Sequence, residues 1–349
     1  MGIKNLKKLI QKNAKTAIKP KPDLQGKRVA IDSSILLYKS RYLHNGDNFH
    51  IVGFLSTVIG YLEENITPVF VFDGPAPQAK KNVLDKRCES RISMIKRVND
   101  LKTTLIEMEN IDDIDTFIEE ENVTENCEKV KEIQKLNTQI HNIEKNILIV
   151  KKIHSDQTME FLETLGIPFL RAYSEAEETC SFLQKNGHVD YVITEDTDSL
   201  AFGANEVIFG NDVYNLETIL DCLEITYDEF IDLCILCGCD YTCTIPKIGP
   251  VSALSLIKKH RSIENIIELN KKYTIPSDFD YQQARNLFKQ NETYNIVQNF
   301  DLQNMDIKKV KQQLNTWGIH NCDYFINKLN FLRNNIKESS YEFLGDDGS

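Results

Sequence analysis

Seven acidic residues lie next to predicted turns, where each would follow or open a secondary-structure element. They are Asp32, Asp73, Glu175, Glu177, Asp196, Asp198 and Asp240. Carboxylates gathered in one place repel one another unless cations neutralise them. Oxygen ligands of this kind suit Mg²⁺ or Mn²⁺, and two such ions about 4 Å apart are the arrangement that cleaves phosphodiester bonds. A single strand-end Asp more often caps a helix, so the prediction of a two-metal site rests on the whole set.

Three predicted strands deliver an acid at their carboxyl ends. The segments are Arg28–Asp32, Pro68–Asp73 and Tyr191–Asp196. Helical patterns, notably Val52–Glu64 and Glu175–Gln184, alternate with these strands, which predicts an α/β fold with a mostly parallel central sheet. Open parallel sheets place their sites beyond the carboxyl ends of the strands. We therefore expect the acids to converge at one edge of the sheet.

The composition is that of a globular protein with a negative net charge. The 349 residues include 41 basic and 52 acidic side chains, which gives a net charge of −11. This charge argues against a uniformly basic surface that coats nucleic acid or membrane, but a local basic patch is compatible with it. The longest apolar runs, such as Pro68–Phe72, are too short to span a bilayer, and the N-terminus lacks an apolar signal-peptide stretch. We expect an intracellular protein.

The chain contains nine cysteines, which in an intracellular protein should be reduced thiols. Four of them lie within ten positions, at Cys234, Cys237, Cys239 and Cys243, a spacing compatible with a zinc or iron–sulfur site. This cluster overlaps the apolar helix pattern Phe230–Leu236, and no second CxxC pair exists to close a zinc ribbon. We interpret these cysteines as small buried hydrophobic residues, with the metal site as the alternative.

Residues 78–165 contain neither Pro nor Gly and have helix-period apolar residues among many charges, which predicts long helices outside the sheet. Within this stretch, Ile111–Glu128 holds eight acidic residues and no Lys or Arg. The segment is interpreted either as a solvated insertion or as an acidic segment that pairs with the basic flanks Lys80–Lys102 and Lys129–Lys152.

Two sets of short motifs follow one another along the chain. The N-terminal set comprises Met1–Ile3, Leu6–Ile10, Val29–Ser34, Val71–Gly74 and Pro77–Gln78. The internal set comprises Gly166–Pro168, Ser174–Glu177, Thr194–Asp198 and Asp232–Leu236, followed by Gly238, Asp240 and Tyr241. Together they resemble the flap endonuclease 1 family of XPG/Rad2-type 5′ nucleases. The resemblance covers roughly residues 1–267, and Ser174–Cys180 and Phe72–Arg87 favour the flap endonuclease 1 branch.

The resemblance implies a PIN-like 5′ nuclease fold with a helical arch and a helix-two-turn-helix region. It divides the chain into an N-terminal nuclease block (1–105), an arch insertion (106–150), an internal nuclease block with the helix-two-turn-helix (151–267) and a helical C-terminal region (268–349). It assigns Asp32, Asp73, Glu175 and Glu177 to a first Mg²⁺ and Asp196, Asp198 and Asp240 to a second, with Mn²⁺ as a possible substitute. Two such ions would activate water and stabilise the leaving oxygen.

The resemblance also implies contacts with DNA. Lys80 and Arg87 match the basic pair of the first arch helix, and Arg91 is on the same predicted helix face. Tyr38 matches the aromatic residue that stacks on a base beside the cut. The other implied DNA contacts are Gly2, Glu175, Gly238, Asp240, Gly249, Lys258 and Lys259. The oxygens for a bound K⁺ are implied at Thr244, Ile245 and Ile248. Solvated basic helix faces and ordinary helix starts are the alternatives.

The sequence also departs from the family pattern. Thr57 and Gly60 stand where the family has arginines, and the loop after Tyr42 has only Asp47 as an acid, so the acidic wedge beside a 3′-flap pocket is reduced. The tail from Tyr341 to Ser349 has no clamp-binding motif, which argues against binding of a sliding clamp. We expect a monomer that acts in the nucleus. The sequence is rich in Asn, Ile and Lys, a composition typical of AT-rich genomes, so a viral protein that acts at a site of viral DNA replication is the alternative.

The predicted function is a structure-specific 5′ flap endonuclease and 5′–3′ exonuclease that cleaves DNA at flap, nick or gap junctions in replication and repair. The alternatives are a catalytically silent junction-binding relative, which would have lost some of the seven acids, and an exonuclease-1-like enzyme. A phosphatase of the haloacid-dehalogenase type needs an Asp-x-Asp motif after the first strand, whereas Asp32 is followed by Ser33 and Ser34.

Overall fold

The computed structural model describes residues 2–44, 46–115, 123–147, 149–269, 272–289, 300–319 and 322–342 of the chain. The chain forms two compact units, one of residues 1–80 and 151–349 and the other of residues 81–150. The first unit contains a seven-stranded sheet. The strands are β1 (Ile18–Pro20), β2 (Arg28–Asp32), β3 (Thr67–Phe72), β4 (Phe169–Arg171), β5 (Tyr191–Ile193), β6 (Glu206–Phe209) and β7 (Asp212–Asn215).

The strand order in this sheet is β1-β7-β6-β5-β2-β3-β4. The five strands from β6 to β4 are parallel, with Asp32 of β2 opposite Val71 of β3 and Ile31 opposite Ile193 of β5. The strands β7 and β1 are antiparallel to their neighbours. The predicted mostly parallel α/β sheet is therefore confirmed, and β5, β2 and β3 lie side by side at its centre.

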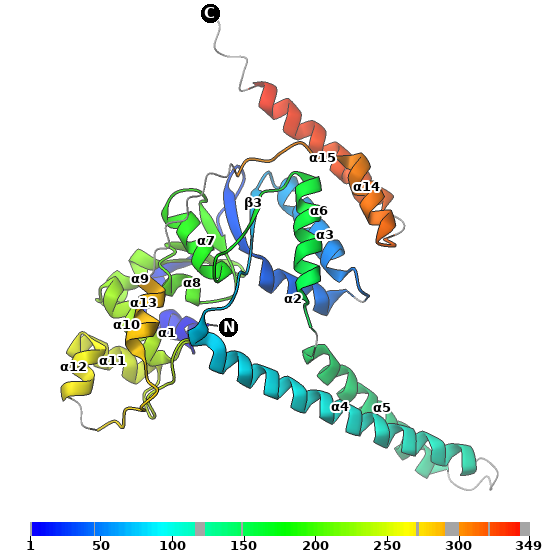
Figure 1. The fold of residues 1–349 in the computed structure, drawn as a ribbon, viewed down its shortest axis with the longest axis horizontal. Coiled ribbons are helices and arrows are strands. Elements are labelled where there is room, and N and C mark those ends of the chain that lie inside the picture. Colours follow the sequence, from blue (N-terminus) through cyan, green and yellow to red (C-terminus); the bar gives the residue numbers. More distant parts are fainter. Residues whose placement is uncertain are drawn as a thin grey trace, which may run out of the picture. The chain divides into compact units, whose positions relative to one another are not determined.

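Helices cover the sheet and extend beyond it. In the first unit they are α1 (Leu6–Asn13), α2 (Ser33–Leu43), α3 (Phe49–Glu63), α6 (Lys152–Leu165), α7 (Ala176–Lys185), α8 (Asp198–Ala201), α9 (Leu216–Leu223), α10 (Tyr227–Cys237), α11 (Pro250–His260), α12 (Ile263–Leu269), α13 (Tyr281–Lys289), α14 (Ile307–Thr316) and α15 (Asp323–Glu342), with short 3₁₀ turns at Lys15–Ala17 and Gln78–Lys80. Helix α7 packs on β2, β3 and β5, while α3 packs on β3 and α6, as Figure 1 shows on either side of β3.

The central strands form because their residues are apolar on both faces. Val29, Ala30 and Ile31 of β2 are buried, as are residues 68–72 of β3, and sequences buried on both faces are typical of parallel strands covered by helices. Asp32 then caps α2 by accepting the backbone N–H groups of Ser34 and Ile35. The predicted strand Tyr191–Asp196 ends earlier in the structure, at Ile193; residues 194–196 form the loop that leads to α8.

Four strands escape the sequence patterns. The hairpin of β6 and β7 turns through Gly210 and Asn211, and Gly210 has φ 64°. A glycine in a two-residue loop after the apolar run Val207–Phe209 is a hairpin signal, which would have predicted this pair. The strands β1 and β4 are only three residues long, too short for alternation to be detected.

The four clustered cysteines lie near the end of α10. Cys234, Cys237 and Cys239 are buried in the main hydrophobic core, and Cys243 Sγ lies 3.3 Å from Asp278 Oδ1. The apolar surroundings of the first three thiols agree with their interpretation as small core residues, whereas Cys243 is only partly buried. Helix α10 itself starts with a capping box, in which Thr226 and Glu229 bind each other's backbone N–H groups.

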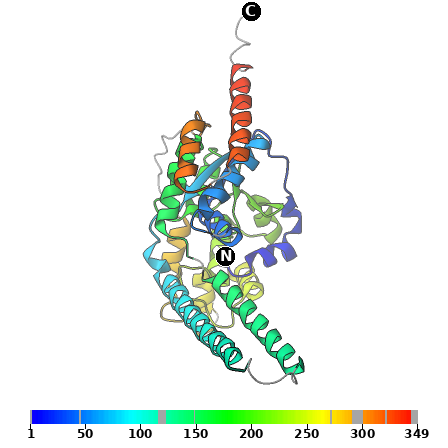
Figure 2. The same cartoon turned by 90° about the vertical axis from the view of Figure 1, so that its right-hand side faces the viewer.

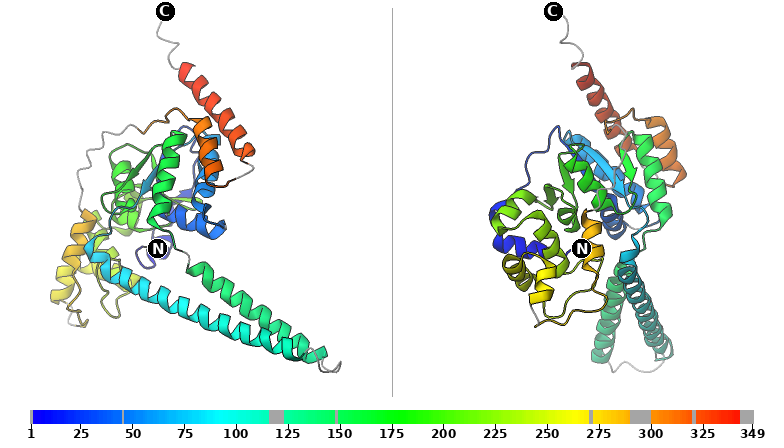
Figure 3. Two further views of the ribbon diagram at one scale, coloured as in Figure 1. Left: turned by 45° about the vertical axis from the view of Figure 1, so that its right-hand side comes forward. Right: turned by 60° about the vertical axis from the view of Figure 1, so that its left-hand side comes forward.

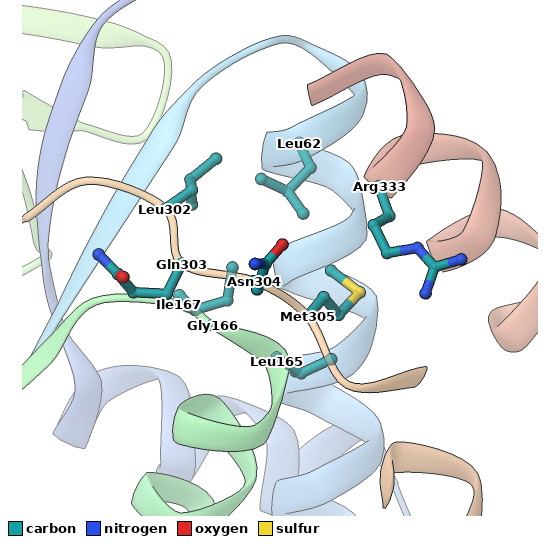
Figure 4. Close-up of a pocket in the computed structure, with 9 residues that line it drawn as sticks. All are labelled: Leu62, Leu165, Gly166, Ile167, Leu302, Gln303, Asn304, Met305 and Arg333. Carbon is teal, nitrogen blue, oxygen red and sulfur yellow. The ribbon is translucent and has the colours of Figure 1, made fainter. Parts of the chain in front are cut away.

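The C-terminal helices pack on α3 and α6. Helix α14 contacts α6 and helix α15 contacts α3, as Figure 3 shows for the orange and red helices. The preceding segment is fixed by hydrogen bonds from Gln303 N to Gly166 O (2.8 Å) and from Asp306 N to Thr164 O (3.2 Å). A cavity of about 30 Å³ remains between Leu62, Gly166, Met305 and Arg333, as Figure 4 shows; it has room for about one water molecule.

The second unit consists of two long helices, α4 (Lys81–Asp115) and α5 (Val123–Asn146), which pack side by side (Figure 2). The predicted long helices of residues 78–165 are thus α4, α5 and α6. Residues 116–122 of the acidic segment Ile111–Glu128 lie outside the described residues, as do all its side chains. The predicted boundary at residue 105 falls inside α4, and the four-block division of the chain remains a prediction. In the described part of the chain, every helix is too short or too polar to cross a membrane.

Candidate active site

All seven predicted acids lie at the carboxyl edge of the parallel strands. Asp32 is the last residue of β2, Asp73 directly follows β3, and Asp196 lies three residues after the end of β5. The other four acids are positioned by helices. Glu175 is the N-cap of α7, Glu177 lies in its first turn, Asp198 begins α8, and Asp240 follows α10. Since β5, β2 and β3 are adjacent and α7 crosses all three, these elements bring the acids together.

Hydrogen bonds orient the acids on β2 and β3. Asp32 Oδ1 accepts the Ser34 backbone N–H at 2.9 Å, and Thr194 Oγ1 donates to Asp32 Oδ2 at 3.4 Å. Asp73 Oδ1 accepts the backbone N–H of Ala176 at 2.9 Å, while Ser34 Oγ donates to Asp73 Oδ2. One oxygen of Asp73 thus ties β3 to the start of α7, which carries Glu175 and Glu177.

The N-terminal residues pack against a second group of acids. Asp196 Oδ1 accepts the Asp198 backbone N–H at 3.0 Å. Asp198 Oδ1 is buried and has no hydrogen-bond partner among the described residues. Gly2 has φ 79°, and a Cβ at this position would lie 2.0 Å from Asp196 Oδ1 and 2.7 Å from Asp198 Oδ1. Only glycine fits here, so Gly2 belongs to the wall of the site.

Burial and mutual repulsion disfavour the ionised carboxylates. Burial, with the Asp73 charge, raises the pKa of Asp32 to about 7. Burial also holds the pKa of Glu177 well above its usual range, with contributions from Asp32 and Asp196, and it does the same to Asp198, with a contribution from Asp196. Two divalent ions would relieve the repulsion and give the unpartnered Asp198 oxygen a ligand role, so the donor set fits hard cations such as Mg²⁺.

Lys80 partly neutralises the cluster in this structure. Its ammonium pairs with Glu175 Oε1 and lies 3.8 Å from Asp240 Oδ2. Burial lowers the pKa of Lys80, but the Glu175 charge, helped by Glu177 and Asp240, outweighs burial and raises it. Within the described ranges, no three His, Cys, Asp or Glu side chains are arranged to hold one metal ion together.

Tyr241 is a site residue to which the sequence patterns gave no role. Its hydroxyl donates to Glu175 Oε2, so Tyr241 and Lys80 engage the two oxygens of one carboxylate. Burial and the nearby Glu175 charge hold the pKa of Tyr241 well above its usual range, which keeps the hydroxyl protonated as a donor. The signal in the sequence was its position directly after the acid Asp240.

The structure places the other predicted DNA contacts on several elements. Tyr38 lies on α2 with 46% of its surface exposed. Arg87 and Arg91 lie on α4, four residues apart, in the second unit. The Gly238 carbonyl accepts the Lys4 backbone N–H at 3.0 Å, and Gly249 is the N-cap of α11.

A groove of about 500 Å³ runs between α1 and α11. Lys258 and Lys259 line it together with Lys12 and Asn13 of α1. Lys258 also pairs with Glu224 at 3.2 Å. The sequence patterns did not single out Lys12; the signal was the lysine-rich N-terminal helix, which has lysines at positions 7, 8 and 12.

The residues predicted to bind K⁺ form the loop between α10 and α11. Thr244 is partly exposed, whereas Ile245 and Ile248 are buried. The Ile245 carbonyl accepts the Ile248 backbone N–H at 3.2 Å, and Lys247 has a φ of 69°. The loop is thus a tight turn, and Pro250 starts the following helix at its first turn.

Comparison with known proteins agrees with this architecture. The XPG N-terminal domain matches residues 1–94, and the XPG I-region matches residues 166–240. Flap endonuclease 1 of Aedes aegypti is 37% identical over 315 residues, which are 83% of this chain and 75% of the relative. Flap endonuclease 1 of Encephalitozoon cuniculi is 36% identical over 310 residues, covering 82% and 81% of the two chains.

Two solved structures share the fold. The catalytic core of Rad2 in complex with DNA substrate aligns with a TM-score of 0.69 at 21% identity and covers 95% of this chain and 100% of the other. Flap endonuclease-1 from Methanococcus jannaschii aligns with a TM-score of 0.62 at 24% identity and covers 91% and 96% of the two chains. The sequence identity to the flap endonucleases over most of both chains, together with the carboxylate cluster on a 5′ nuclease fold, decides the assignment. This chain belongs to the flap endonuclease 1 family.

Proposed function

We propose that this protein is a structure-specific 5′ flap endonuclease that hydrolyses DNA phosphodiester bonds at flap, nick or gap junctions, with a related 5′–3′ exonuclease activity. The observation that carries the proposal is the convergence of seven carboxylates at the carboxyl edge of a parallel sheet, including a buried Asp198 oxygen that has no hydrogen-bond partner in the described part of the chain. The relatives named flap endonuclease 1 support the substrate class.

The cofactors in this proposal are two divalent ions, Mg²⁺ or, as a substitute, Mn²⁺. One ion would be held by Asp32, Asp73, Glu175 and Glu177 and the other by Asp196, Asp198 and Asp240. Such ions supply Lewis-acid chemistry that activates water and stabilises the leaving oxygen. The chain's own part is to hold the carboxylates in place through Ser34, Thr194 and backbone N–H groups and to keep the site narrow at Gly2.

Lys80 has two partners in turn under this proposal. Its ammonium pairs with Glu175 and lies close to Asp240. If divalent ions held these carboxylates, the ammonium would be available to the scissile phosphate, where a positive charge stabilises the transition state. Arg87 and Arg91 on α4 are proposed to contact the DNA strand that contains the scissile phosphate. Tyr38 is proposed to stack on the base beside the cut.

We propose that the groove of Lys12, Lys258 and Lys259 binds the phosphates of the duplex beside the junction. Phosphate contacts by lysines position a nuclease on DNA without reading its sequence. Support comes from the clustering of three cationic side chains, Lys12 on α1 and Lys258 and Lys259 in the last turn of α11, around one groove. The turn at Thr244, Ile245 and Ile248 is the proposed K⁺ site. A K⁺ ion bound there would hold the turn against the phosphate backbone of the DNA duplex.

The alternative of a catalytically silent relative is not favoured, because all seven acids are present and converge. The test is cleavage of one labelled strand in a series of substrates: a 5′ flap, a nick, a gap, a 3′ flap and a blunt duplex. In Mg²⁺ we expect the 5′ flap to be cut fastest, at its junction, and cleavage to stop in EDTA. Equal cleavage of all five substrates, or cleavage in EDTA, would contradict the proposal.

A further inference from the structure

Helix α13 lies beyond both matched family regions, yet it packs against α10, the helix that leads into Asp240 (Figure 1). Its residues Tyr281–Lys289 belong to the stretch interpreted from sequence only as a helical C-terminal region. Its contacts connect it to the carboxylate cluster in two steps.

The first step is an ionic anchor. The Arg285 guanidinium donates to both oxygens of Asp232 on α10, at 2.8 and 2.9 Å, and its Nη1 donates to Glu264 of α12 at 2.7 Å. Asp232 is buried and also accepts the backbone N–H of Ile263 at 3.0 Å. A guanidinium bound by two carboxylates in this fork geometry fixes α13 in position along α10.

The second contact is made by Phe288, which lies three residues after Arg285 on the same face of α13. The ring of Phe288 is buried and meets Tyr241 edge-on at 5.1 Å between centroids. Phe288 also contacts Phe202 at 5.2 Å, and Phe202 contacts Tyr241 at 6.4 Å. These three rings form a closed aromatic cluster, so the position of the Tyr241 ring depends on Phe288.

The Tyr241 hydroxyl donates to Glu175 Oε2. Because the ring is confined by Phe202 and Phe288, its hydroxyl holds the Glu175 carboxylate at a fixed place beside the other acids. The order of contacts is therefore α13, Phe288, Tyr241 and Glu175.

We propose that α13 braces the carboxylate cluster and that Phe288 is a positioning residue that acts on Glu175 through the Tyr241 hydroxyl. The inference rests on the proposed function, because it takes Glu175 as a ligand of a divalent cation. Hydrogen-bond partners of metal ligands typically change metal affinity by 10- to 100-fold when they are lost.

The test is the affinity of the full chain for Mn²⁺ without DNA, measured by titration calorimetry. We expect Tyr241→Phe, which keeps the ring and removes the hydroxyl, to weaken Mn²⁺ binding about 10-fold, and Phe288→Leu to weaken it by a similar factor. The matched control is Phe300→Leu. Phe300 is also buried but packs against His188, whose carbonyl accepts from Arg28 at the opposite end of β2 from Asp32.

The double variant Tyr241→Phe/Phe288→Leu distinguishes positioning from general loosening of the core. If Phe288 acts through the hydroxyl, the double variant binds Mn²⁺ as weakly as Tyr241→Phe alone, within about 2-fold. Effects that multiply in the double variant would overturn the proposal. So would an equal loss of affinity in Phe300→Leu, or wild-type affinity in Tyr241→Phe.

The outcomes also separate this inference from the proposed function. If the wild-type chain cuts 5′ flaps while Tyr241→Phe and Phe288→Leu bind Mn²⁺ normally, the positioning role of Phe288 is rejected and the nuclease assignment is retained. If the two variants lose Mn²⁺ affinity as expected but the wild-type chain cuts no flap, the positioning role of Phe288 is supported and the nuclease assignment is rejected.

Discussion

Lys80 is the residue whose surroundings say most about the chemistry. The Lys80 ammonium lies between Glu175 and Asp240 and neutralises part of their negative charge, as a bound metal ion would. The positive charge of Lys80 is therefore directed at the place where the reacting phosphate would lie. A charge in this position stabilises the transition state more than the bound substrate.

We expect Lys80→Met to lower the single-turnover rate of flap cleavage by about two orders of magnitude while leaving flap affinity within about 3-fold. Rates from rapid quench and affinities from fluorescence anisotropy, both in Mg²⁺, measure the two effects. Lys81→Met is the control, because the neighbouring Lys81 is exposed and the loss of charge is the same. Affinity and rate falling in proportion would make Lys80 an ordinary phosphate anchor.

His50 predicts a pH dependence of stability that is independent of the acids. Its ring is buried between α3 and α6 and bonds Gln157 at 3.0 Å. Burial, with the nearby His154, lowers the pKa of His50 to about 4 from an unfolded value near 6.5. The unfolded chain therefore binds more protons between pH 6.5 and 4, and the free energy of unfolding falls as the pH falls through this range.

The contribution of His50 amounts to about 2 kcal/mol between pH 7 and 5. The buried acids with raised pKa values add stability as the pH falls over the same interval, so the prediction concerns the difference between two proteins. In urea unfolding we expect the wild type to lose about 2 kcal/mol relative to His50→Leu between pH 7 and 5. Identical pH profiles for the two proteins would show that the pKa of His50 is the same in the folded and unfolded chains, which would contradict the prediction.

At the scale of elements, the junction between α6 and β4 depends on Gly166. This residue has φ 67°, and a Cβ would lie 2.4 Å from the Gln303 carbonyl oxygen. The close approach lets the segment of residues 300–306 dock on the end of α6 and carry the C-terminal helices with it.

We expect Gly166→Ala to reduce the free energy of unfolding by at least about 1 kcal/mol more than Gly187→Ala. Gly187 is the matched control because it has a similar φ of 72° and no atom within 4 Å of its added Cβ. Both variants bear the same backbone strain, so the difference in their urea midpoints measures the clash alone. Equal destabilisation would mean that the contact with Gln303 contributes nothing.

The elements that the sequence predicted well are those with strong local signals. The strand β2 reads as an apolar run that ends in an acid and was predicted to the residue, and the predicted helix Glu175–Gln184 differs from α7 by one residue at each end. The hairpin β6–β7 is not among the predicted elements, although Gly210 in its two-residue turn is a hairpin signal. The short strands β1 and β4 exist because neighbours pair with them, and such pairing is decided by tertiary structure.

The candidate site was predictable for a related reason. Acids that follow strands or open helices meet at one edge of the sheet once its parallel topology is recognised. Tyr241 and Phe288 were not predictable in the same way. Their importance depends on the ring contacts among Phe202, Tyr241 and Phe288, which are far apart in the sequence.

At the scale of the whole molecule, the charge is distributed unevenly. The net charge is −11, yet residues 1–27 contain eight lysines and a single acid, Asp23. A protein whose overall charge repels DNA needs such a local region to approach it. The groove of Lys12, Lys258 and Lys259 lies where this lysine-rich segment packs on α11.

We expect Lys12→Gln and Lys259→Gln each to reduce the slope of log affinity against log salt concentration by about 0.9, because each removes one phosphate contact. Binding of a flap substrate over a salt series in Ca²⁺ measures the slopes. Lys308→Gln on α14 is the control, since Lys308 is exposed and carries the same charge. Slopes that do not differ from the control would place the duplex elsewhere.

The central claim is that carboxylates at the sheet edge perform phosphodiester hydrolysis, and its most direct test is the paired variants Asp196→Asn and Glu195→Gln. Both remove one negative charge from adjacent residues, but Asp196 is buried in the cluster and Glu195 is exposed. In single-turnover cleavage of a labelled 5′ flap in Mg²⁺, we expect Asp196→Asn to lose at least about 1,000-fold in rate with flap affinity nearly unchanged, and Glu195→Gln to cleave as the wild type does. Cleavage by Asp196→Asn at a rate near that of the wild type would contradict the account.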